Sequence, residues 1–324
     1  MINTLIEKIK GKGTRIVFTE GSDPRILEAA IRLHKEDILV PVLLGNRAEI
    51  MGTANAHGWD IEGIETLDPI EYKNMDMMVS KAIELRKGKM DEEQARAACL
   101  KTNFFGTMYV KLGCADGLLG GATYSTADTV RPALQLIKTK PGNSIVSSCF
   151  ILMKDNAETL VMGDCSINID PTADDLVEIT LQTAHTVRQF GIEPRVGLLS
   201  YSTLGSAKGT SVAKVNEAAT RLKRMPLDFG VEGEIQFDCA VAPEVAKLKA
   251  PDSKVAGNIN TFIFPNIDSG NIGYKIAARL GQYEAIGPIL QGLNAPINDL
   301  SRGCNAEEVF KMAIVTAAQK FMDI

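Results

Sequence analysis

The chain has 324 residues, of which 45% are hydrophobic and 23% are charged, and its formal net charge is −5. A chain of this length and apolar content can bury two cores, so we expect two domains of roughly 150 residues each. The acidic balance and the lack of Lys or Arg runs exclude nucleic acid as a partner and a polybasic membrane-binding patch.

Six cysteines lie in apolar runs without CxxC spacing, which is typical of reduced, buried thiols. The first residues contain no apolar stretch long enough for a signal peptide, and nowhere do about 18 apolar residues run together. We therefore expect a cytoplasmic protein with no membrane partner. The three histidines have no neighbours at ligand spacing, so we also expect no metal site.

Strand and helix patterns alternate through the first part of the chain. After a short helix, a buried strand at 14–20 runs into a helix that Pro24 begins, with Ser22 or Asp23 as its cap. The next patterns are a strand at 38–44, helices at 75–86 and 91–105, and a strand at 115–119. Such alternation predicts an α/β fold with a mostly parallel sheet covered by helices on both faces.

The stretch GGATYSTADTVRPALQ follows the strand at 115–119. Two glycines, the hydroxyls of Thr123, Ser125 and Thr126, and Arg131 precede Pro132. Proline suits the first turn of a helix and breaks its interior, so we expect a helix to begin at Pro132. A loop of this composition can wrap an anion.

A break at 138–143 separates these elements from a second set. Strand patterns at 144–154 and 158–169 predict a hairpin that opens a second domain. The following patterns predict a helix capped at 170–172, a strand at 195–202, a helix at 212–225, a strand at 234–239, a short helix near Val245, a strand at 261–265, a helix at 270–280 and a strand at 285–293.

The last helix carries Phe310, Ile314, Ala317 and Phe321 at helical spacing. It follows a crossover from the second unit, and we expect it to pack on the first. The predicted domains are therefore 1–143 with 295–324, and 144–294.

The strand at 195–202 leads into TLGSAKGTS, which contains Ser206. This loop resembles a P-loop only loosely, because its lysine precedes Gly209 instead of following the last glycine. The geometry that cradles a triphosphate is absent, and this excludes a nucleotide triphosphatase.

Three arginines stand at or just before expected helix starts, namely Arg25, Arg131 and Arg302. A cation there opposes the helix macrodipole, so we expect either a bound anion or, for each arginine, a nearby carboxylate or water. Three such positions in separate βα turns favour a bound ligand, because these turns meet at the carboxyl edge of a parallel sheet. Arg86 lies near a helix C-terminus, where a cation is favoured in any case.

The segment 285–304 delivers Asn298, Asp299, Ser301 and Arg302 to the start of the last helix, where anions bind. Asp299 and Glu308 are candidate bases, and Glu308 equally fits a capping box with Asn305. Ser301 has no adjacent histidine, which disfavours a serine acyl-enzyme.

Cys304 and Cys165 are candidate nucleophiles. The position of Cys304 close to a helix start would lower the pKa of its thiol. Buried cysteine is nevertheless ordinary packing in most proteins, so we expect neither to be catalytic.

Four stretches resemble the phosphate acetyl/butyryltransferase family, namely FGTMYVKLGCADGLLGGATYSTADTVRPALQ, LLSYSTLGSAKG, FPNIDSGNIGYKIAARLG and GPILQGLNAPINDLSRGC. The resemblance covers nearly the whole chain in the right order. It implies two three-layer α/β/α domains related to the isocitrate/isopropylmalate dehydrogenase fold, with a cleft between them, and a homodimer. It also implies reversible conversion of acetyl-CoA and phosphate to acetyl phosphate and CoA in a ternary complex, with CoA as a substrate and no cofactor, metal or covalent acyl-enzyme.

The resemblance assigns roles to particular residues. Ser301 would lie near the reacting carbonyl and Arg302 on phosphate, while Glu308 stands where some members have an aspartate proposed as the base for the CoA thiol. The residues expected to bind phosphate or CoA are Arg25, Arg86, Arg131, Thr123, Ser125, Thr126, Ser206 and Asn298.

Three alternatives stay open. The acyl group could be butyryl, or the chain could be a non-catalytic acyl-CoA-binding module like the related domain of some malic enzymes. The presence of Ser301, Arg302 and Arg131 together disfavours such a module. A metal-dependent decarboxylating dehydrogenase is suggested by the fold alone and disfavoured by the lack of clustered aspartates.

Overall fold

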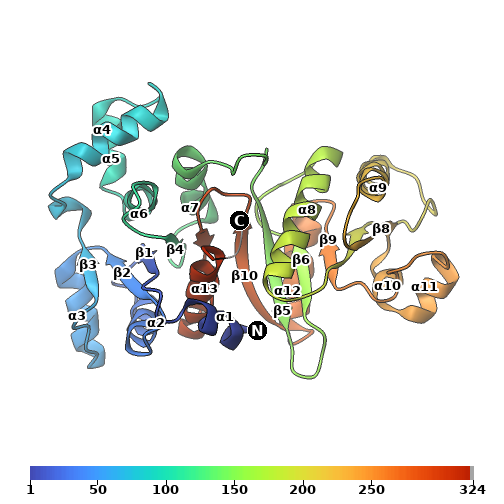
Figure 1. Ribbon diagram of the computed structural model, residues 1–324, viewed down its shortest axis with the longest axis horizontal. Coiled ribbons are helices and arrows are strands. Elements are labelled where there is room, and N and C mark those ends of the chain that lie inside the picture. Colours follow the sequence, from blue (N-terminus) through green and yellow to red (C-terminus); the bar gives the residue numbers. More distant parts are fainter. Residues whose placement is uncertain (322–324) are drawn as a thin grey trace. The chain divides into compact units, whose positions relative to one another are not determined.

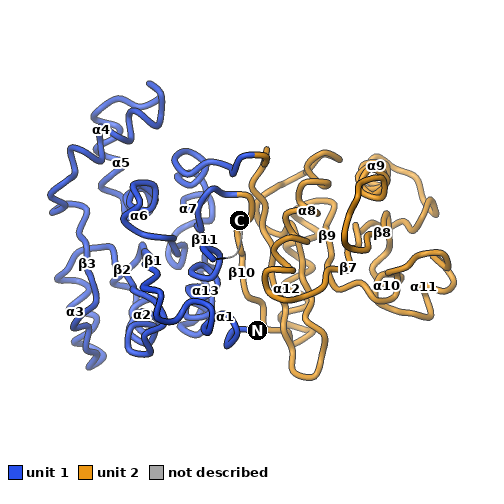
Figure 2. The backbone as a smooth tube through the Cα atoms, viewed as in Figure 1, with its two compact units in different colours: residues 1–141, 293–324 blue, residues 142–292 orange. Residues whose placement is uncertain are grey.

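The structure, a computed structural model, describes residues 1–321 and shows two compact units. Unit 1 is formed by Met1–Pro141 and Leu293–Ile324, and unit 2 by Gly142–Gly292 (Figure 2). The chain thus leaves unit 1 and returns to it. The boundaries predicted from the sequence, 143/144 and 294/295, differ from these by two residues.

The core of unit 1 is a parallel sheet with the strand order β11-β4-β1-β2-β3 (Figure 1). Its central strand β1 buries Ile16, Val17 and Phe18, as expected for a strand covered on both faces. The strands are β1 (Arg15–Phe18), β2 (Val40–Leu44), β3 (Glu65–Leu67), β4 (Gly117–Gly120) and β11 (Ile297–Asp299).

Helices cover both faces of this sheet (Figure 1). On one face α13 packs against α1, α2 and the strands β1, β4 and β11, while α6 and α7 pack on the other face. The helices of unit 1 are α1 (Ile2–Ile9), α2 (Pro24–Lys35), α3 (Arg47–His57), α4 (Met75–Arg86), α5 (Glu92–Cys99), α6 (Thr102–Lys111), α7 (Thr126–Pro132) and α13 (Ala306–Gln319), with a 3-10 turn η1 (Pro69–Glu71) and a π-helical turn η2 (Ala133–Ile137).

Unit 2 is built on a mixed sheet with the strand order β10-β5-β6-β9-β7-β8. The predicted hairpin is confirmed, since β5 pairs antiparallel with β6, and β10 adds a second antiparallel pair. The remaining pairs are parallel. The strands are β5 (Ser147–Met153), β6 (Leu160–Gly163), β7 (Arg195–Leu199), β8 (Gly230–Ile235), β9 (Thr261–Ile263) and β10 (Glu284–Gln291).

Two hydrophobic clusters lie on the two faces of the unit 2 sheet. One joins α8 and α9 to the sheet through Leu176, Val215 and Leu198, and the other joins α10, α11 and α12 to Phe150 and Phe262. The helices are α8 (Ala173–Gln189), α9 (Thr210–Lys223), α10 (Phe237–Val241), α11 (Pro243–Lys249) and α12 (Ile267–Arg279).

The helix predicted to begin at Pro132 begins at Thr126 instead, so that prediction is wrong. The backbone N and the Oγ of Ser125 both donate to Asp128 Oδ2, at 3.3 and 2.7 Å, and this starts the helix. Pro132 is the last residue of α7, where the chain changes to the π-helical turn η2. Arg131 therefore stands in the last turn of a helix, where the macrodipole favours a cation.

Two further elements differ from the prediction. The strand expected at 234–239 ends at Ile235, and the following residues form α10, because a short apolar run does not distinguish strand from helix. The helix expected at 91–105 is two helices, since Lys101 is extended and α6 starts anew at Thr102. The sequence patterns did not predict helix α3 or the strands β3 and β11. Of these, β11 carries Asn298 and Asp299 of the candidate site.

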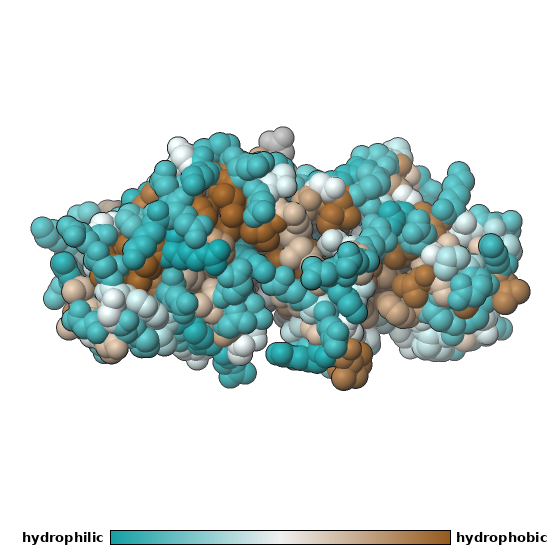
Figure 3. Space-filling view, turned by 90° about the horizontal axis from the view of Figure 1, so that it is seen from below, coloured by the Kyte–Doolittle hydropathy of each residue, from teal (hydrophilic) through white to brown (hydrophobic). Residues whose placement is uncertain are grey.

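The surface is mainly hydrophilic on the face drawn in Figure 3, where apolar side chains form separate patches. Among the helices of residues 1–321, none combines the length and hydrophobicity that a membrane crossing requires.

Candidate functional site

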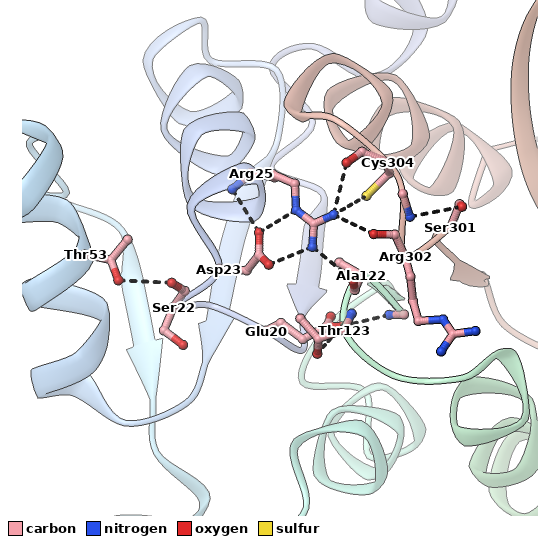
Figure 4. Close-up of polar contacts among 12 residues, drawn as sticks. Glu20, Ser22, Asp23, Arg25, Thr53, Ala122, Thr123, Ser301, Arg302 and Cys304 are labelled. Carbon is pink, nitrogen blue, oxygen red and sulfur yellow. Dashed lines mark hydrogen bonds and ion pairs between the residues drawn. The ribbon is translucent and has the colours of Figure 1, made fainter.

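Three neighbouring strands of unit 1 end at the same edge of the sheet. Phe18 of β1 is in register with Leu119 of β4, and Asp299 of β11 is in register with Gly120. Because all three strands are parallel, the connections that follow them meet at one edge, which is where α/β sheets bind ligands. These connections are residues 19–25, 120–126 and 300–304 (Figure 4).

Arg25 lies at the centre of this edge, and its side chain uses each of the five N–H donors that a guanidinium has. Nε and Nη2 donate to the two carboxylate oxygens of Asp23 at 3.0 and 2.8 Å. Nη2 also donates to the carbonyl of Ala122 at 2.9 Å. Nη1 donates to the carbonyls of Arg302 and Cys304 at 2.9 and 3.0 Å (Figure 4).

The Asp23 carboxylate therefore supplies a negative charge that offsets the positive charge of Arg25 at the start of α2. Its Oδ1 also accepts from the backbone N of Arg25 at 2.9 Å, which makes Asp23 the predicted N-cap. A nearby carboxylate, one of the partners expected for this arginine, is thus present, and ligand binding by Arg25 stays a prediction.

The three hydroxyls of the glycine-rich loop each donate to a carboxylate. Thr123 donates to Glu20 at 3.2 Å, Ser125 to Asp128 at 2.7 Å, and Thr126 to Asp299 at 2.7 Å. Each hydroxyl has a single proton to donate, and here that proton is directed at a carboxylate. Binding of phosphate by these hydroxyls therefore stays a prediction.

Glu20 is a residue of this edge that sequence reasoning missed. Its Oε1 accepts from the backbone N atoms of Gly121 and Thr123 at 3.2 and 2.9 Å, and its Oε2 accepts from Thr19. Burial raises the pKa of Glu20, although these hydrogen bonds lower it. A polar residue directly after a buried strand was the available signal.

Gly120 and Gly121 are required by close contacts. A Cβ at Gly120 would lie 2.1 Å from Thr19 Oγ1, and one at Gly121 would lie 2.2 Å from Asp299 Oδ1. Gly121 also has φ +101°, which disfavours any residue with a Cβ. The predicted glycine-rich turn is thus a tightly packed one.

Asp299 lies beneath this loop with only 1% of its surface exposed. Its Oδ1 accepts from Thr129 at 2.6 Å and its Oδ2 from Thr126 at 2.7 Å. Burial raises the pKa of Asp299 to about 6, although both hydrogen bonds lower it. In this position the carboxylate holds the start of α7, and a role as base stays a prediction.

Ser301 and Arg302 are both exposed at the end of this segment. Figure 4 shows the Arg302 side chain extending away from Arg25. Among residues 1–321, neither the Arg302 nor the Arg131 guanidinium makes a hydrogen bond or ion pair. These two guanidinium groups are available to bind an anion. Arg25 differs from them, because its N–H donors already have acceptors in this structure.

Asn298 and Glu308 stabilise the elements that flank Ser301. Asn298 is fully buried, and its Nδ2 donates to Thr316 Oγ1 and Gln319 Oε1 of α13 at 2.9 and 2.7 Å. Glu308 forms the predicted capping box, because its Oε2 accepts from Asn305 N at 3.2 Å while Asn305 Oδ1 accepts from Glu308 N at 2.9 Å. Substrate contact by Asn298 and base catalysis by Glu308 stay predictions.

Burial raises the pKa of the Cys304 thiol to about 11, although Arg25 lowers it. This outweighs the lowering expected from the nearby helix start, so the thiol stays protonated near neutral pH. Burial also raises the pKa of Cys165 well above its ordinary value. Neither thiol has the environment of a nucleophile.

Arg86 and Ser206 lie outside the three connections. Arg86 ends α4, and its Nε is buried without a hydrogen-bond partner among the described residues. Ser206 belongs to unit 2, where its Oγ accepts from Thr203 N at 2.9 Å. Within the described part of the chain, no three His, Cys, Asp or Glu side chains are grouped to hold a metal ion.

Known proteins resemble the chain over almost its entire length. The family described as phosphate acetyl/butaryl transferase matches residues 1–317. A phosphate acetyltransferase of Bacillus subtilis (strain 168) is 51% identical over 319 residues, which cover 98% of each chain. A solved phosphotransacetylase structure from Streptococcus pyogenes has a TM-score of 0.94 at 51% identity, covering 98% of this chain and 97% of that one.

A more distant likeness concerns the fold alone. A Salmonella typhimurium structure assigned to 4-hydroxythreonine-4-phosphate dehydrogenase has a TM-score of 0.56 at 12% identity, covering 94% of this chain and 98% of that one. The prediction of two α/β domains related to a dehydrogenase fold is confirmed.

We expect Gly121→Ala to lower the free energy of unfolding by more than the roughly 1–2 kcal/mol of left-handed backbone strain. The added methyl group would meet Asp299 at 2.2 Å. Gly113→Ala is the matched control in the same unit, since its φ is +75° and nothing lies within 4 Å of its Cβ. Denaturant unfolding measures the free energy of unfolding of both variants. Equal decreases in the two variants would show that the loop moves aside for the added methyl group.

Proposed function

The chain belongs to the phosphate acetyl/butyryltransferase family, and we propose that the reacting groups of its acetyl transfer gather at the carboxyl edge of the unit 1 sheet. The reaction is the reversible transfer of an acetyl group between CoA and inorganic phosphate, so the chain is an acyltransferase. The observation that carries the proposed location is the exposed pair Ser301 and Arg302, held beside two other βα connections.

Arg302 and Arg131 supply the positive charge that the phosphate requires. Both guanidinium groups are exposed and make no ion pair among the described residues, so a bound phosphate needs no existing pair to break. A guanidinium binds two phosphate oxygens at once and keeps its charge at every physiological pH. In the proposed site Arg302 holds the phosphoryl group of acetyl phosphate and stabilises the phosphate that leaves.

Ser301 is proposed to donate a hydrogen bond to the acetyl carbonyl. Its Oγ accepts from Gly303 N at 3.3 Å, which leaves the hydroxyl proton free for another acceptor. Negative charge develops on this carbonyl oxygen when the CoA thiol attacks, and a fixed donor there lowers the barrier.

Glu308 is proposed to accept the proton of the CoA thiol. A thiol is only a few per cent ionised at pH 7, so a nearby carboxylate assists the attack. Among the described residues the capping box uses Glu308 Oε2 alone, which leaves Oε1 for a proton. Cap and base are therefore compatible roles for one side chain.

The remaining substrate contacts are proposed from the same family. Arg86, Ser206, Asn298 and the loop hydroxyls of Thr123, Ser125 and Thr126 are proposed to bind phosphate or CoA, and Asp299 to assist catalysis. We also propose a cytoplasmic enzyme that works without cofactor or metal. The free state of all six cysteines supports a reducing compartment.

A homodimer that associates through α12 is part of this proposal. Ile272, Ile276 and Leu280 follow one another at intervals of four residues and are 58%, 53% and 81% exposed. Apolar side chains in such a row mark a protein contact surface. A second copy can cover the row by two-fold symmetry without any further partner.

We expect purified protein to form acetyl-CoA from acetyl phosphate and CoA in the presence of a chelator, and Arg302→Ala to lower kcat/KM by about 100-fold or more. Arg47→Ala removes another exposed arginine at a helix start of unit 1 and should be without effect. A continuous thioester assay measures all three proteins. Lack of turnover by the wild type would disprove the activity, and normal turnover by Arg302→Ala would remove that residue from the site.

Glu308→Gln separates the base from the cap. Glutamine keeps a side-chain oxygen for the capping box, so we expect an unfolding free energy within about 1 kcal/mol of wild type. If Glu308 is the base, kcat falls by about 100-fold. A normal kcat at every pH would leave Glu308 with the cap alone.

We expect sedimentation to give twice the 35.0 kDa chain mass for the wild type and a single chain mass for Ile276→Asp. A buried charge at the centre of the α12 row opposes association. Ile70→Asp, which alters a side chain 78% exposed in unit 1, should remain a dimer. An Ile276→Asp dimer of normal affinity would place the contact elsewhere.

A further inference from the structure

Arg25 joins three separate connections of unit 1 through one side chain. Asp23 belongs to the β1–α2 connection, Ala122 to the loop after β4, and Arg302 and Cys304 to the segment after β11. We propose that Arg25 is a positioning residue whose guanidinium fixes the carbonyl groups of Arg302 and Cys304, the residues on either side of Gly303. It thereby sets the directions in which Ser301 and Arg302 point. The kinetic part of this inference rests on the acetyl transfer proposed above.

The hydrogen bonds that the Arg25 N–H groups already make distinguish a positioning role from phosphate binding. Each N–H of the Arg25 guanidinium already has an acceptor, and two of those acceptors are carboxylate oxygens. To contact phosphate, Arg25 would have to give up a charge-assisted bond to Asp23 or a bond to a carbonyl. Arg302 and Arg131 offer a guanidinium without such a cost.

The segment that Arg25 holds has few other restraints. Ser301, Arg302 and Gly303 are exposed, and nothing but Ser301 Oγ lies within 4 Å of a Cβ built on Gly303. Local bonds close the turn, since Cys304 N donates to Ser301 O at 2.9 Å and Gly303 N to Ser301 Oγ. The bonds from Arg25 to the carbonyls of Arg302 and Cys304 are its links to other elements of the sheet edge.

Asp23 positions Arg25 in turn. One carboxylate caps α2 and holds the arginine through two parallel bonds, so the arginine is anchored to a helix end and not to a mobile surface. The side chain of Asp23 is 12% exposed, and that of Arg25 is 28% exposed. The pair therefore transmits the position of the β1–α2 connection to the segment 301–304.

The first test is hydrogen exchange in substrate-free, full-length protein. In Arg25→Ala we expect the amides of residues 302–305 to exchange about tenfold faster than in the wild type, because two charge-assisted hydrogen bonds to this segment are lost. Arg32→Ala is the matched control, since Arg32 lies on the same helix and pairs with Glu307 of α13 without contacting the segment. This measurement needs no activity and stands even if the proposed reaction fails.

The second test is the kinetic pattern. For Arg25→Ala we expect kcat to fall by about 100-fold while KM for acetyl phosphate changes less than about threefold, since a misplaced catalytic group mainly slows the reaction. Asp23→Asn keeps the helix cap but loosens the arginine, so it should lower kcat in the same direction. The double variant with Asp23→Asn and Arg25→Ala should show no larger decrease in kcat than Arg25→Ala alone.

The opposite pattern would overturn the proposal. If Arg25 binds phosphate directly, Arg25→Ala raises KM with unchanged exchange at 302–305, and Asp23→Asn leaves KM the same or lowers it by freeing the arginine. Should Arg25→Ala fail to fold, Arg25→Lys and Asp23→Asn carry the same comparison, and normal exchange in both would equally reject a positioning role.

Discussion

The parallel pairing of β11 with β4 is the constraint on which the proposed site depends. Asp299 lies opposite Gly120 in this pairing, which brings residues from the end of the chain beside the connection that follows Phe18 in β1. The apolar face of α13 buries Phe310 and Ile314 and packs on α1 and α2, so hydrophobic burial holds the returning segment in place. Without this return, Ser301 and Arg302 would have no fixed relation to Arg25.

Three carboxylates at this sheet edge stabilise the surrounding loop and helix starts. Asp23 caps a helix, Glu20 accepts from the amides of the glycine-rich loop, and Asp299 holds two threonines beneath it. Burial beneath the loop raises the pKa of both Glu20 and Asp299. Preorganised groups of this kind favour an acyl transfer that needs two substrates aligned and a phosphate neutralised, because little reorganisation remains when they react.

Sequence signals predicted the start of a helix correctly where one or two residues determine that start. Asp23 and Pro24 mark the start of α2, and the capping box of Asn305 and Glu308 marks the start of α13. Pro132 shows the limit of such signals, since proline also fits the end of a helix that Ser125 and Asp128 begin earlier. Glu20 could not be recognised as a loop support, because its partners Gly121 and Thr123 lie about a hundred residues away along the chain.

The sequence by itself determined the family, the two-unit α/β fold, and the residue types of the site, because helix caps, apolar periodicity and motif spacing are local properties of the chain. Only the tertiary structure decided which of those residues are free to meet a ligand. Asn298 and Asp299 read alike in the sequence, yet the alternation of a strand turns one toward α13 and the other beneath the loop. Arg25 and Arg302 likewise read as equal cations, and the acceptors supplied by distant segments occupy one and leave the other exposed.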